Sequence, residues 1–430
     1  MKKLKWWGLV GLVTTGIVLS GCGGSNDSSD TASVRLANAT ITHPSLDLLA
    51  ASAVAVSGTT TDTISAYVSP ASGSSTTFQL NDAGGSTALA TTVPTLTAGS
   101  AYTLLAYESS GVVKTAWLSE NYDTPTSGTA QVRIYNAAAD AGKLDVYITS
   151  TSTVLSSAVS PTTNFITGTV PYTNTLSAIS PGTYRVRVTG YGDQSDLRLD
   201  IPSITLTNQE NLMIVLTPAA GGILLNGSTL IQQSTYAATR NTNARVRLAA
   251  AVSGGATVAA SAGSTVIDGG SVSPAFGTYA LVPASSALNI TVNSASVGAP
   301  ATTLTAGNDY TLLVYGPAGS AAASLITDDN RPPTDTTTTK LRMINGITGS
   351  SGALTLTVNG SVVGSTIASG AVSTYVSVAG STTAMSMILY SSAVSGVYYT
   401  NSTSNILNAN AVYTVLVGGD VSAPQLLIRK

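Results

Sequence analysis

Apolar and polar residues alternate with a period of two in many short segments of this chain. Residues 184–189 (Tyr-Arg-Val-Arg-Val-Thr) alternate cleanly, which is typical of a strand with one buried face. Residues 212–216 and 310–315 are nearly continuous apolar runs, which predict central strands of a sandwich. Turn sequences such as Asn-Asp-Ala-Gly-Gly at residues 81–85 separate these runs, and no long 3.6-residue period indicates a helix. The pattern predicts an all-β chain.

A short arginine-containing pattern recurs four times. It stands at residues 34–38, 132–136, 246–250 and 341–345, so its arginines are 98, 114 and 95 residues apart. A second pattern closes the units, with Leu-Thr-Ala-Gly followed by Tyr-Thr-Leu-Leu at residues 96–105 and its relatives in the other units. Periods near 100 residues are too long for solenoid repeats and indicate tandem whole domains.

Each unit has the size of an immunoglobulin-like β-sandwich, although the Cys–Trp–Cys hallmark of antibody domains is absent. We therefore expect tandem immunoglobulin-like β-sandwich domains arranged as a string. The predicted boundaries are residues 33–128 for unit 1, 129–240 for unit 2, 241–330 for unit 3 and 340–430 for unit 4, with a stiff, extended linker at residues 331–339.

The N-terminus has the order of a secretory signal. Lys2, Lys3 and Lys5 precede a largely apolar segment at residues 6–19, which is too short to cross a bilayer comfortably. The sequence Leu-Ser-Gly-Cys follows at residues 19–22. This arrangement resembles the signal peptide of bacterial lipoproteins.

The lipoprotein resemblance implies a signal peptide at residues 1–21, cleavage between Gly21 and Cys22, and acylation of Cys22 by chains such as palmitate. Two or three acyl chains would hold the protein stably on a membrane. Residues 22–32 are then a flexible tether, since they are polar and rich in Gly and Ser. Gly23, rather than Asp, follows the anchor, and the resemblance therefore points to the outer membrane or the cell surface.

Composition narrows the function classes. Hydrophobic residues make up 43% of the 430 residues and charged residues only 9%, which argues against a disordered tail or a charge-laced helical bundle. The net charge of −2 provides no basic surface for nucleic acid, so we expect no nucleic-acid partner. With one histidine and one cysteine, the sequence predicts no metal site and no cofactor.

Unit 2 carries a family resemblance. Its residues 132–138 (Val-Arg-Ile-Tyr-Asn-Ala-Ala), 144–147 (Leu-Asp-Val-Tyr) and 181–184 (Pro-Gly-Thr-Tyr) resemble the bacterial domain-of-unknown-function 4397 family. Unit 1 matches at residues 34–39 and 46–48, whereas units 3 and 4 keep the arginine and lose the aspartate. The resemblance implies a secreted or lipid-anchored envelope protein and supports the architecture, but it implies no mechanism.

Two arrangements could support other functions. A Ser–His–Asp hydrolase would use His43 as its base with Asp47 four residues later, but no Gly-x-Ser-x-Gly elbow accompanies them and a solvated loop histidine explains His43. A glycan-binding module would expose aromatic residues on one face, and Trp117 with Tyr122 are the candidates. Core packing of Trp117 is favoured over this role.

The charged residues suggest structural roles. We expect the recurrent arginines to form ion pairs in units 1 and 2, Arg35 with Asp47 and Arg133 with Asp145, since each pair is 12 residues apart. The acidic clusters are the only candidates for calcium, and we expect both to be solvated turns; they comprise Asp193, Asp196 and Asp200, and Asp328 with Asp329 and Asn330.

These patterns together predict a non-enzymatic, lipid-anchored envelope protein with a structural or adhesive role. Its partners would be the membrane, through Cys22, and a protein or glycan at the cell surface. A glycan-binding module is the first alternative and a secreted hydrolase the second.

Overall fold

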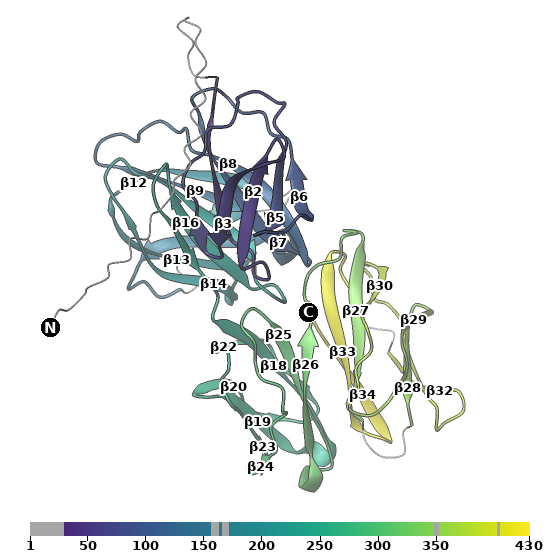
Figure 1. Ribbon diagram of the computed structural model, residues 1–430. Helices are drawn as coiled ribbons and strands as arrows, with labels where there is room; N and C mark the ends of the chain where they lie inside the picture. Colours follow the sequence, from purple (N-terminus) through teal and green to yellow (C-terminus); the bar gives the residue numbers. More distant parts are fainter. Residues whose placement is uncertain (1–29, 156–162, 166–171, 348–351, 402–404) are drawn as a thin grey trace, which may run out of the picture.

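The computed structural model describes residues 30–155, 163–165, 172–347, 352–401 and 405–430. The signal peptide, the cleavage site at Gly21 and Cys22, and the tether as far as residue 29 lie outside the described residues. The predicted end of the tether at residue 32 is wrong, because Thr31 pairs with Ala71 and Ala32 is buried in the core of the first unit. The described chain folds into tandem β-sandwiches, which confirms the predicted fold class (Figure 1). Its only helical segments are three short 3₁₀ turns, and none is long and apolar enough to span a membrane.

Unit 1 consists of two four-stranded sheets. The strands β4-β1-β7-β8 form one sheet, and β3-β2-β5-β6 form the other. The bounds are β1 (Ser33–Asn38), β2 (Ser45–Ala50), β3 (Ala53–Thr60), β4 (Thr63–Ile64), β5 (Phe78–Asp82), β6 (Ala88–Thr92), β7 (Ala101–Ser109) and β8 (Val112–Ser119).

Unit 2 has the same plan with one strand added. Its sheets are β12-β9-β15-β16-β17 and β11-β10-β13-β14. The bounds are β9 (Ala130–Asn136), η1 (Ala139–Ala141), β10 (Leu144–Ser150), β11 (Thr163–Phe165), β12 (Tyr172–Ile179), β13 (Gly182–Gly190), β14 (Asp193–Leu206), β15 (Asn211–Pro218), β16 (Leu225–Ile231) and β17 (Tyr236–Thr239).

Unit 3 divides one edge strand into two pieces. Its sheets are β21-β18-β25-β26, with β22 also on β18, and β20-β19-β23-β24. The bounds are β18 (Asn243–Val252), η2 (Ser253–Gly255), β19 (Thr257–Ala262), β20 (Thr265–Val272), β21 (Ala275–Phe276), β22 (Ala280–Pro283), β23 (Leu288–Val292), β24 (Ala295–Val297), β25 (Asp309–Gly316), η3 (Ala318–Ser320) and β26 (Ala322–Asp328).

The described part of unit 4 has eight strands in two sheets. These are β30-β27-β33-β34 and β29-β28-β31-β32. The bounds are β27 (Thr338–Asn345), β28 (Leu354–Val358), β29 (Ser361–Ile367), β30 (Val376–Ala379), β31 (Met387–Ser391), β32 (Val397–Asn401), β33 (Ala411–Asp420) and β34 (Ala423–Arg429).

The sheet that contains the first strand of a unit is called its front sheet, and the other its back sheet. In every front sheet the first strand, which carries the recurrent arginine, runs parallel to its neighbour: β1 to β7, β9 to β15, β18 to β25 and β27 to β33. A hydrophobic core lies between the front and back sheets of each unit. Figure 1 shows the four sandwiches that result.

The front sheets are also covered on their outer faces, because the units pack in pairs. Leu104 of β7 belongs to the core of unit 1, whereas its neighbour Leu105 belongs to a second cluster shared with Met213 and Val215 of unit 2. A corresponding cluster joins Leu313 of unit 3 to Leu416 of unit 4. Burial on both faces explains why these strands are nearly continuous apolar runs.

Glycine allows the close approach of units 3 and 4. A Cβ added to Gly346 would lie 2.2 Å from the Cβ of Ala251. A Cβ added to Gly418 would lie 2.9 Å from a side-chain atom of Pro274. The two sandwiches therefore form pair 3–4, as units 1 and 2 form pair 1–2, and the expected string of separate domains is replaced by two packed pairs.

Most units begin and end at the same end of the sandwich. In unit 1, Ser33 pairs with Ala101 at the start of β7, and Tyr102 pairs with Ser119 at the end of β8. Unit 2 is different because β17 adds to the edge of β16 and runs back, so that Thr239 pairs with Gly227 at the far end. The fifth strand therefore carries the chain away from its starting end before unit 3 begins.

The sheet edges differ in regularity. The back-sheet edges β3, β20 and β29 contain register shifts of the kind made by β-bulges, which discourage further strand pairing. The front-sheet strands β8, β26 and β34 pair with their single neighbours in an unbroken register. Their counterpart in unit 2, β16, is equally regular and has β17 on its other side.

Candidate functional site

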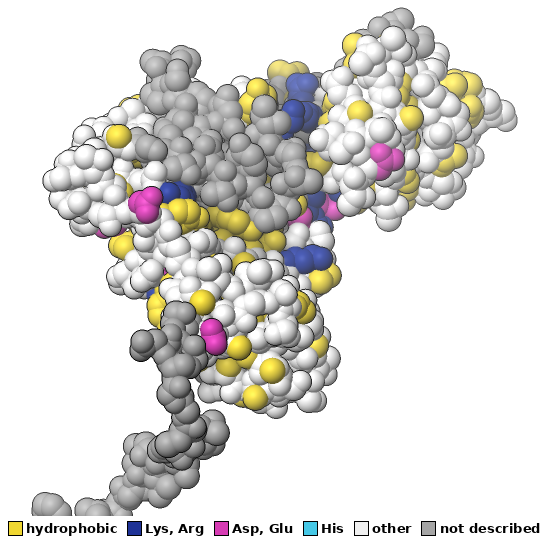
Figure 2. Space-filling model, turned by 90° about the horizontal axis from the view of Figure 1, so that it is seen from above, with side chains coloured by type: hydrophobic (Ala, Val, Ile, Leu, Met, Phe, Trp, Pro, Cys, Tyr) yellow, Lys and Arg dark blue, Asp and Glu magenta, His cyan; other side chains and the backbone are white. Residues whose placement is uncertain are grey.

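Arginine side chains gather inside this molecule. Seven arginines of the described residues are buried, although arginine is normally among the most exposed residues. On the face shown in Figure 2 the charged side chains are few, and several of them lie where the lobes of the molecule meet. The buried arginines are Arg35, Arg133, Arg187, Arg198, Arg245, Arg247 and Arg342.

The recurrent arginine of unit 1 forms a four-residue cluster with a threonine, a glutamate and a tyrosine. Arg35 on β1 points away from the core, and its Nε donates to Thr103 Oγ1 and to Glu120 Oε1, each at 3.0 Å. Its guanidinium lies 4.7 Å from the ring centre of Tyr67, whose hydroxyl donates to Glu120 Oε1 at 2.8 Å. Burial and the neighbouring carboxylate raise the pKa of Tyr67, so the hydroxyl remains a donor.

The same cluster recurs in unit 3. Arg247 Nε donates to Thr311 Oγ1 at 3.0 Å, and the guanidinium lies 4.5 Å from the ring centre of Tyr279. Thr311 Oγ1 and the hydroxyl of Tyr279 both donate to Asp328 Oδ2. Burial, followed by the charge of Asp328, raises the pKa of Tyr279.

Unit 4 contains the cluster without its acid. Arg342 Nε donates to Thr414 Oγ1 at 3.2 Å, and its guanidinium lies 4.6 Å from the ring centre of Tyr375. The carboxylate is supplied by Asp328 of unit 3, which accepts a hydrogen bond from Arg342 Nη2. Burial raises the pKa of Tyr375 to about 12. Asp328 therefore serves arginines from two units.

Unit 2 departs from the pattern, since Met213 stands where the other units have threonine. Arg133 donates to Asn211 Oδ1 at 2.8 Å instead, and the ring centre of Tyr122 lies 3.3 Å from its guanidinium. Burial lowers the pKa of Arg133, and no carboxylate is among its ion-pair partners in the described residues.

The clusters hold neighbouring units together. Arg35 Nη1 donates to the carbonyl of Ser234 in unit 2 at 2.7 Å, and Glu120 Oε2 accepts the backbone N–H of Gln233 at 2.6 Å. In the other pair, Arg247 Nη2 donates to Thr414 Oγ1 of unit 4 at 3.0 Å. Each cluster therefore has partners on both sides of an interface.

A further network joins units 2 and 3. Asp196 accepts hydrogen bonds from Arg198 of its own unit and from Arg245 of unit 3, and Arg245 also pairs with the buried Asp309 at 2.7 Å. Burial opposes ionisation of Asp196, but the two arginines outweigh it and lower its pKa. Buried pairs of this kind require that every partner be present.

The predicted ion pairs of Arg35 with Asp47 and of Arg133 with Asp145 are wrong. Asp47 accepts the N–H groups of Gly58 and Gly84 at 2.8 and 2.9 Å, and Asp145 accepts that of Gly192 at 2.8 Å. Both aspartates lie on back-sheet strands, whereas the arginines point to the outer face of the front sheet. A spacing of 12 residues therefore places the two groups on different sheets.

The prediction that both acidic clusters are solvated turns is also wrong for Asp196 and Asp328. Asp328 and Asp196 are ion-paired to arginines, and Asp328 is 1% exposed. Asp200 pairs with Arg185, and Asp193 accepts the N–H of Ser195. No three His, Cys, Asp or Glu side chains converge in the described chain as a metal site requires.

His43 has two carboxylate neighbours, but Asp47 is not one of them. Its Nδ1 lies 2.7 Å from Asp82 Oδ1, and its Nε2 lies 3.8 Å from Glu108 Oε1. Since Asp47 is bound to backbone N–H groups, the pairing that the hydrolase alternative needs is not formed by these residues.

Trp117 and Tyr122 occupy different environments, and neither is fully exposed. Trp117 meets the ring of Phe78 edge-on at 5.0 Å, and its Nε1 donates to Thr92 Oγ1. Tyr122 lies on Arg133, and its backbone N–H donates to Gln232 Oε1 of unit 2. The two rings therefore do not form a shared platform.

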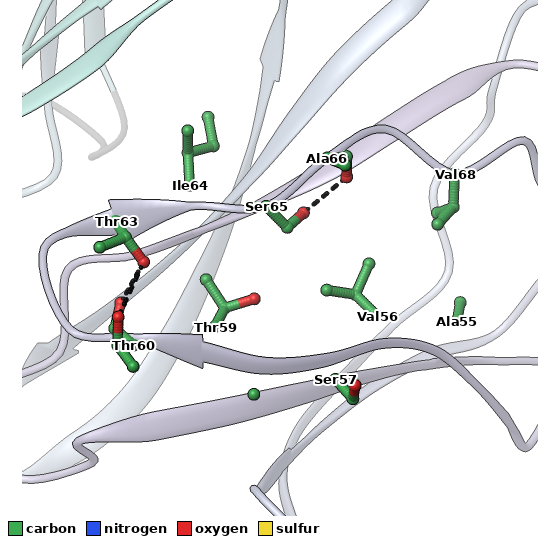
Figure 3. A pocket seen from close by; sticks show the side chains of 11 residues that line it. Ala55, Val56, Ser57, Thr59, Thr60, Thr63, Ile64, Ser65, Ala66 and Val68 are labelled. Carbon is green, nitrogen blue, oxygen red and sulfur yellow. Dashed lines mark hydrogen bonds between the residues drawn. The ribbon is translucent and has the colours of Figure 1, made fainter. Parts of the chain in front are cut away.

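A small cavity of about 360 Å³ opens between β3 and β4 of unit 1 (Figure 3). Val56, Ile64 and Val68 line it together with hydroxyl side chains. Thr60 and Thr63 bond to each other at its edge, and the lining contains no charged residue. This arrangement offers no acid, base or paired nucleophile for catalysis.

The recurrent arginines were evident from the sequence, but their tyrosine, threonine and acid partners were not. A signal was present, because a tyrosine follows the arginine by 32 residues in units 1 and 3 and by 33 in unit 4: Tyr67, Tyr279 and Tyr375. The threonines are the middle residues of the closing Tyr-Thr-Leu pattern, which stands beside the arginine strand only once parallel pairing is known.

The fold and these interfaces define a multidomain β-sandwich protein held together by buried arginine clusters. The model of the family described as Domain of unknown function (DUF4397) matches residues 32–147, which confirms the resemblance for unit 1 and the start of unit 2. A comparison with curated proteins found no match.

The solved structures that are similar to this chain share little sequence with it. A candidate cell adhesion protein from Bacteroides uniformis is 11% identical, with 48% of this chain and 99% of that chain covered and a TM-score of 0.19. The product complex of a multi-modular glycogen-degrading pneumococcal virulence factor, SpuA, is 10% identical, with coverage of 86% and 38% and a TM-score of 0.17. The Bacillus anthracis TIE protein is 10% identical, with coverage of 92% and 68% and a TM-score of 0.14. Similarities this low carry no functional conclusion.

Proposed function

We propose that this chain is a non-enzymatic, lipid-anchored protein of the bacterial envelope, with a structural or adhesive role at the outer membrane or cell surface. The observation that carries the proposal is the Leu-Ser-Gly-Cys sequence at residues 19–22, after a basic and then apolar segment. The only cysteine of the chain stands at the position where a lipoprotein is acylated. Membrane attachment is then through Cys22, and the outward partner is a protein or glycan.

The buried clusters support a structural role. They contain buried arginines whose hydrogen bonds join neighbouring units, so these arginines stabilise the arrangement of the units. A molecule whose domains are fixed relative to one another suits spacing and display. Neither the glycan-binding nor the hydrolase alternative gains a specific observation from Trp117, Tyr122 or His43.

The anchor can be tested by labelling cells with an alkyne analogue of palmitate. The wild-type protein should incorporate the label and partition with membranes, whereas Cys22→Ala should do neither, because it lacks the thiol that the lipid modifies. Ser25→Ala is the matched control in the tether and should behave like the wild type. A wild-type protein that carries no label would contradict the proposal. Protease treatment of intact cells would then show whether the labelled protein faces outward.

A further inference from the structure

In pair 1–2, a regular front-sheet edge pairs with an additional strand. There β17 lies antiparallel to β16 of unit 2 and contacts β4 of unit 1. Tyr236 of β17 packs in the same cluster as Ile64 of β4. Ile64 pairs with Ala37, two residues after Arg35. The added strand therefore fills the space between the front-sheet edge of one unit and the first-strand partner of the other.

Pair 3–4 contains the corresponding place. The strand equivalent to β16 is β26 of unit 3, and the residue equivalent to Ile64 is Val372 of unit 4, which pairs with Ile344 two residues after Arg342. A cavity of about 510 Å³ lies between them. Its lining includes Val372 and residues 325–328, which are four consecutive residues of β26. Two of these residues, Leu325 and Ile326, are equivalent to Thr229 and Leu230 of β16, which pair with β17.

The edge of β26 has backbone groups available for pairing. The carbonyl of Thr327 points outward, because it accepts a hydrogen bond from Arg342 of unit 4 at 3.1 Å. Outward and inward groups alternate along an antiparallel strand, so the N–H and C=O of Leu325 and Ala323 also point outward. These positions match Thr229 and Gly227 of β16, which pair with β17. No strand of the described chain pairs with this edge of β26.

We propose that this cleft binds an extended segment of a partner protein as a fifth strand of the unit 3 front sheet, antiparallel to β26. Backbone hydrogen bonds to Ala323 and Leu325 would supply affinity. A side chain at the position of Tyr236 would pack beside Val372, and an aromatic residue is favoured there because Tyr236 packs in the corresponding cluster of pair 1–2. The inference goes beyond the proposed function, since binding at this cleft requires no lipid anchor.

The probe is the blocked peptide acetyl-Ser-Thr-Tyr-Ala-Ala-Thr-amide, which copies residues 234–239, with a fluorophore for polarisation measurements. It should bind the full chain saturably and slow hydrogen exchange at Ala323 and Leu325. Replacing its tyrosine by alanine should weaken binding on the order of tenfold, since one buried aromatic contact is lost. A peptide with proline for the first alanine should not bind, because it lacks the central N–H.

Val372→Trp should fill the cleft and weaken binding of the same peptide at least about tenfold. Val362→Trp is the matched control, because Val362 is 54% exposed on β29 of the same unit, and it should bind like the wild type. Circular dichroism must show that both variants are folded. If Val372→Trp does not fold, the proposal is tested by the protection of β26 from hydrogen exchange in the wild-type protein. Absence of saturable binding, protection confined to β16, or self-association that the peptide displaces would overturn the proposal.

Discussion

At the scale of single residues, this protein has few charged side chains, and many of its arginines are buried. A buried arginine is costly unless its donors find acceptors, and in units 1, 3 and 4 threonine and a carboxylate accept from the arginine while a tyrosine ring faces its guanidinium. Asp328 carries the greatest share, since it accepts hydrogen bonds from Tyr279, Thr311 and Arg342 and lies 3.7 Å from Arg247. It is therefore the residue whose change tests the clusters most directly.

Asp328→Asn should destabilise the protein by about 3 kcal/mol, because it leaves two buried arginines without a carboxylate. The measurement is the midpoint of urea unfolding followed by circular dichroism. Asp335→Asn is the control, as Asp335 is exposed and accepts hydrogen bonds from Thr337 in its own turn, and its midpoint should not move. Equal midpoints for both variants would show that the cluster contributes nothing to stability.

At the scale of elements, the sequence predicted the strands correctly but did not predict which units and side chains pack against them. The alternation at residues 184–189 correctly indicated a strand, β13. The apolar runs at 212–216 and 310–315 are also central strands, but the sequence could not show that their second face is covered by another unit. The acid partners were missed because Glu120 lies 85 residues beyond Arg35, a distance that only sheet pairing closes.

Ion pairs hold the segment between units 3 and 4 in place. Asp329 accepts hydrogen bonds from Arg331 at 2.6 Å and from Lys340 of unit 4 at 2.8 Å. Partial burial acts to raise its pKa, but these two cations outweigh burial and lower the pKa to about 2. The predicted linker at residues 331–339 therefore starts beside an ion-paired anchor, and β27 already begins at Thr338 within it.

This anchor should give stability a defined pH dependence. Because the folded-state pKa of Asp329 lies below its ordinary value of 3.8, its contribution is complete above about pH 4 and is lost as pH falls toward 2. Asp329→Asn should flatten the decline in unfolding free energy between pH 4 and 2. Asp123→Asn, at an exposed position, should leave that slope unchanged. The readout is urea unfolding at a series of pH values, and identical slopes in all three proteins would refute this assignment.

At the scale of the whole molecule, packing between units decides the shape. Units 3 and 4 approach closely at Gly346, where any side chain would meet Ala251. Sequence alone gave no indication of this contact, since a glycine in a loop is usually explained by a turn. The four repeats indicated the number of sandwiches, but their pairing depends on side chains that meet only after folding.

Gly346→Ala should therefore separate units 3 and 4. A Cβ forced against Ala251 should cost about 1–3 kcal/mol or widen the interface, and small-angle X-ray scattering should report a larger radius of gyration. Gly298→Ala is the matched control, because a Cβ there meets nothing within 4 Å and its φ is not in the left-handed region. An unchanged radius together with unchanged stability would mean that the contact is not tight in solution.

The extra strand β17 has a consequence for how such chains are built. Adding a single strand to a sandwich moves the C-terminal end of the domain from the end where its first strand begins to the opposite end. A following domain then continues outward, where otherwise it would fold back alongside. Gain or loss of one four-residue strand would thus switch a protein of this kind between a compact and an extended arrangement, while the core between the two sheets of each sandwich stays the same.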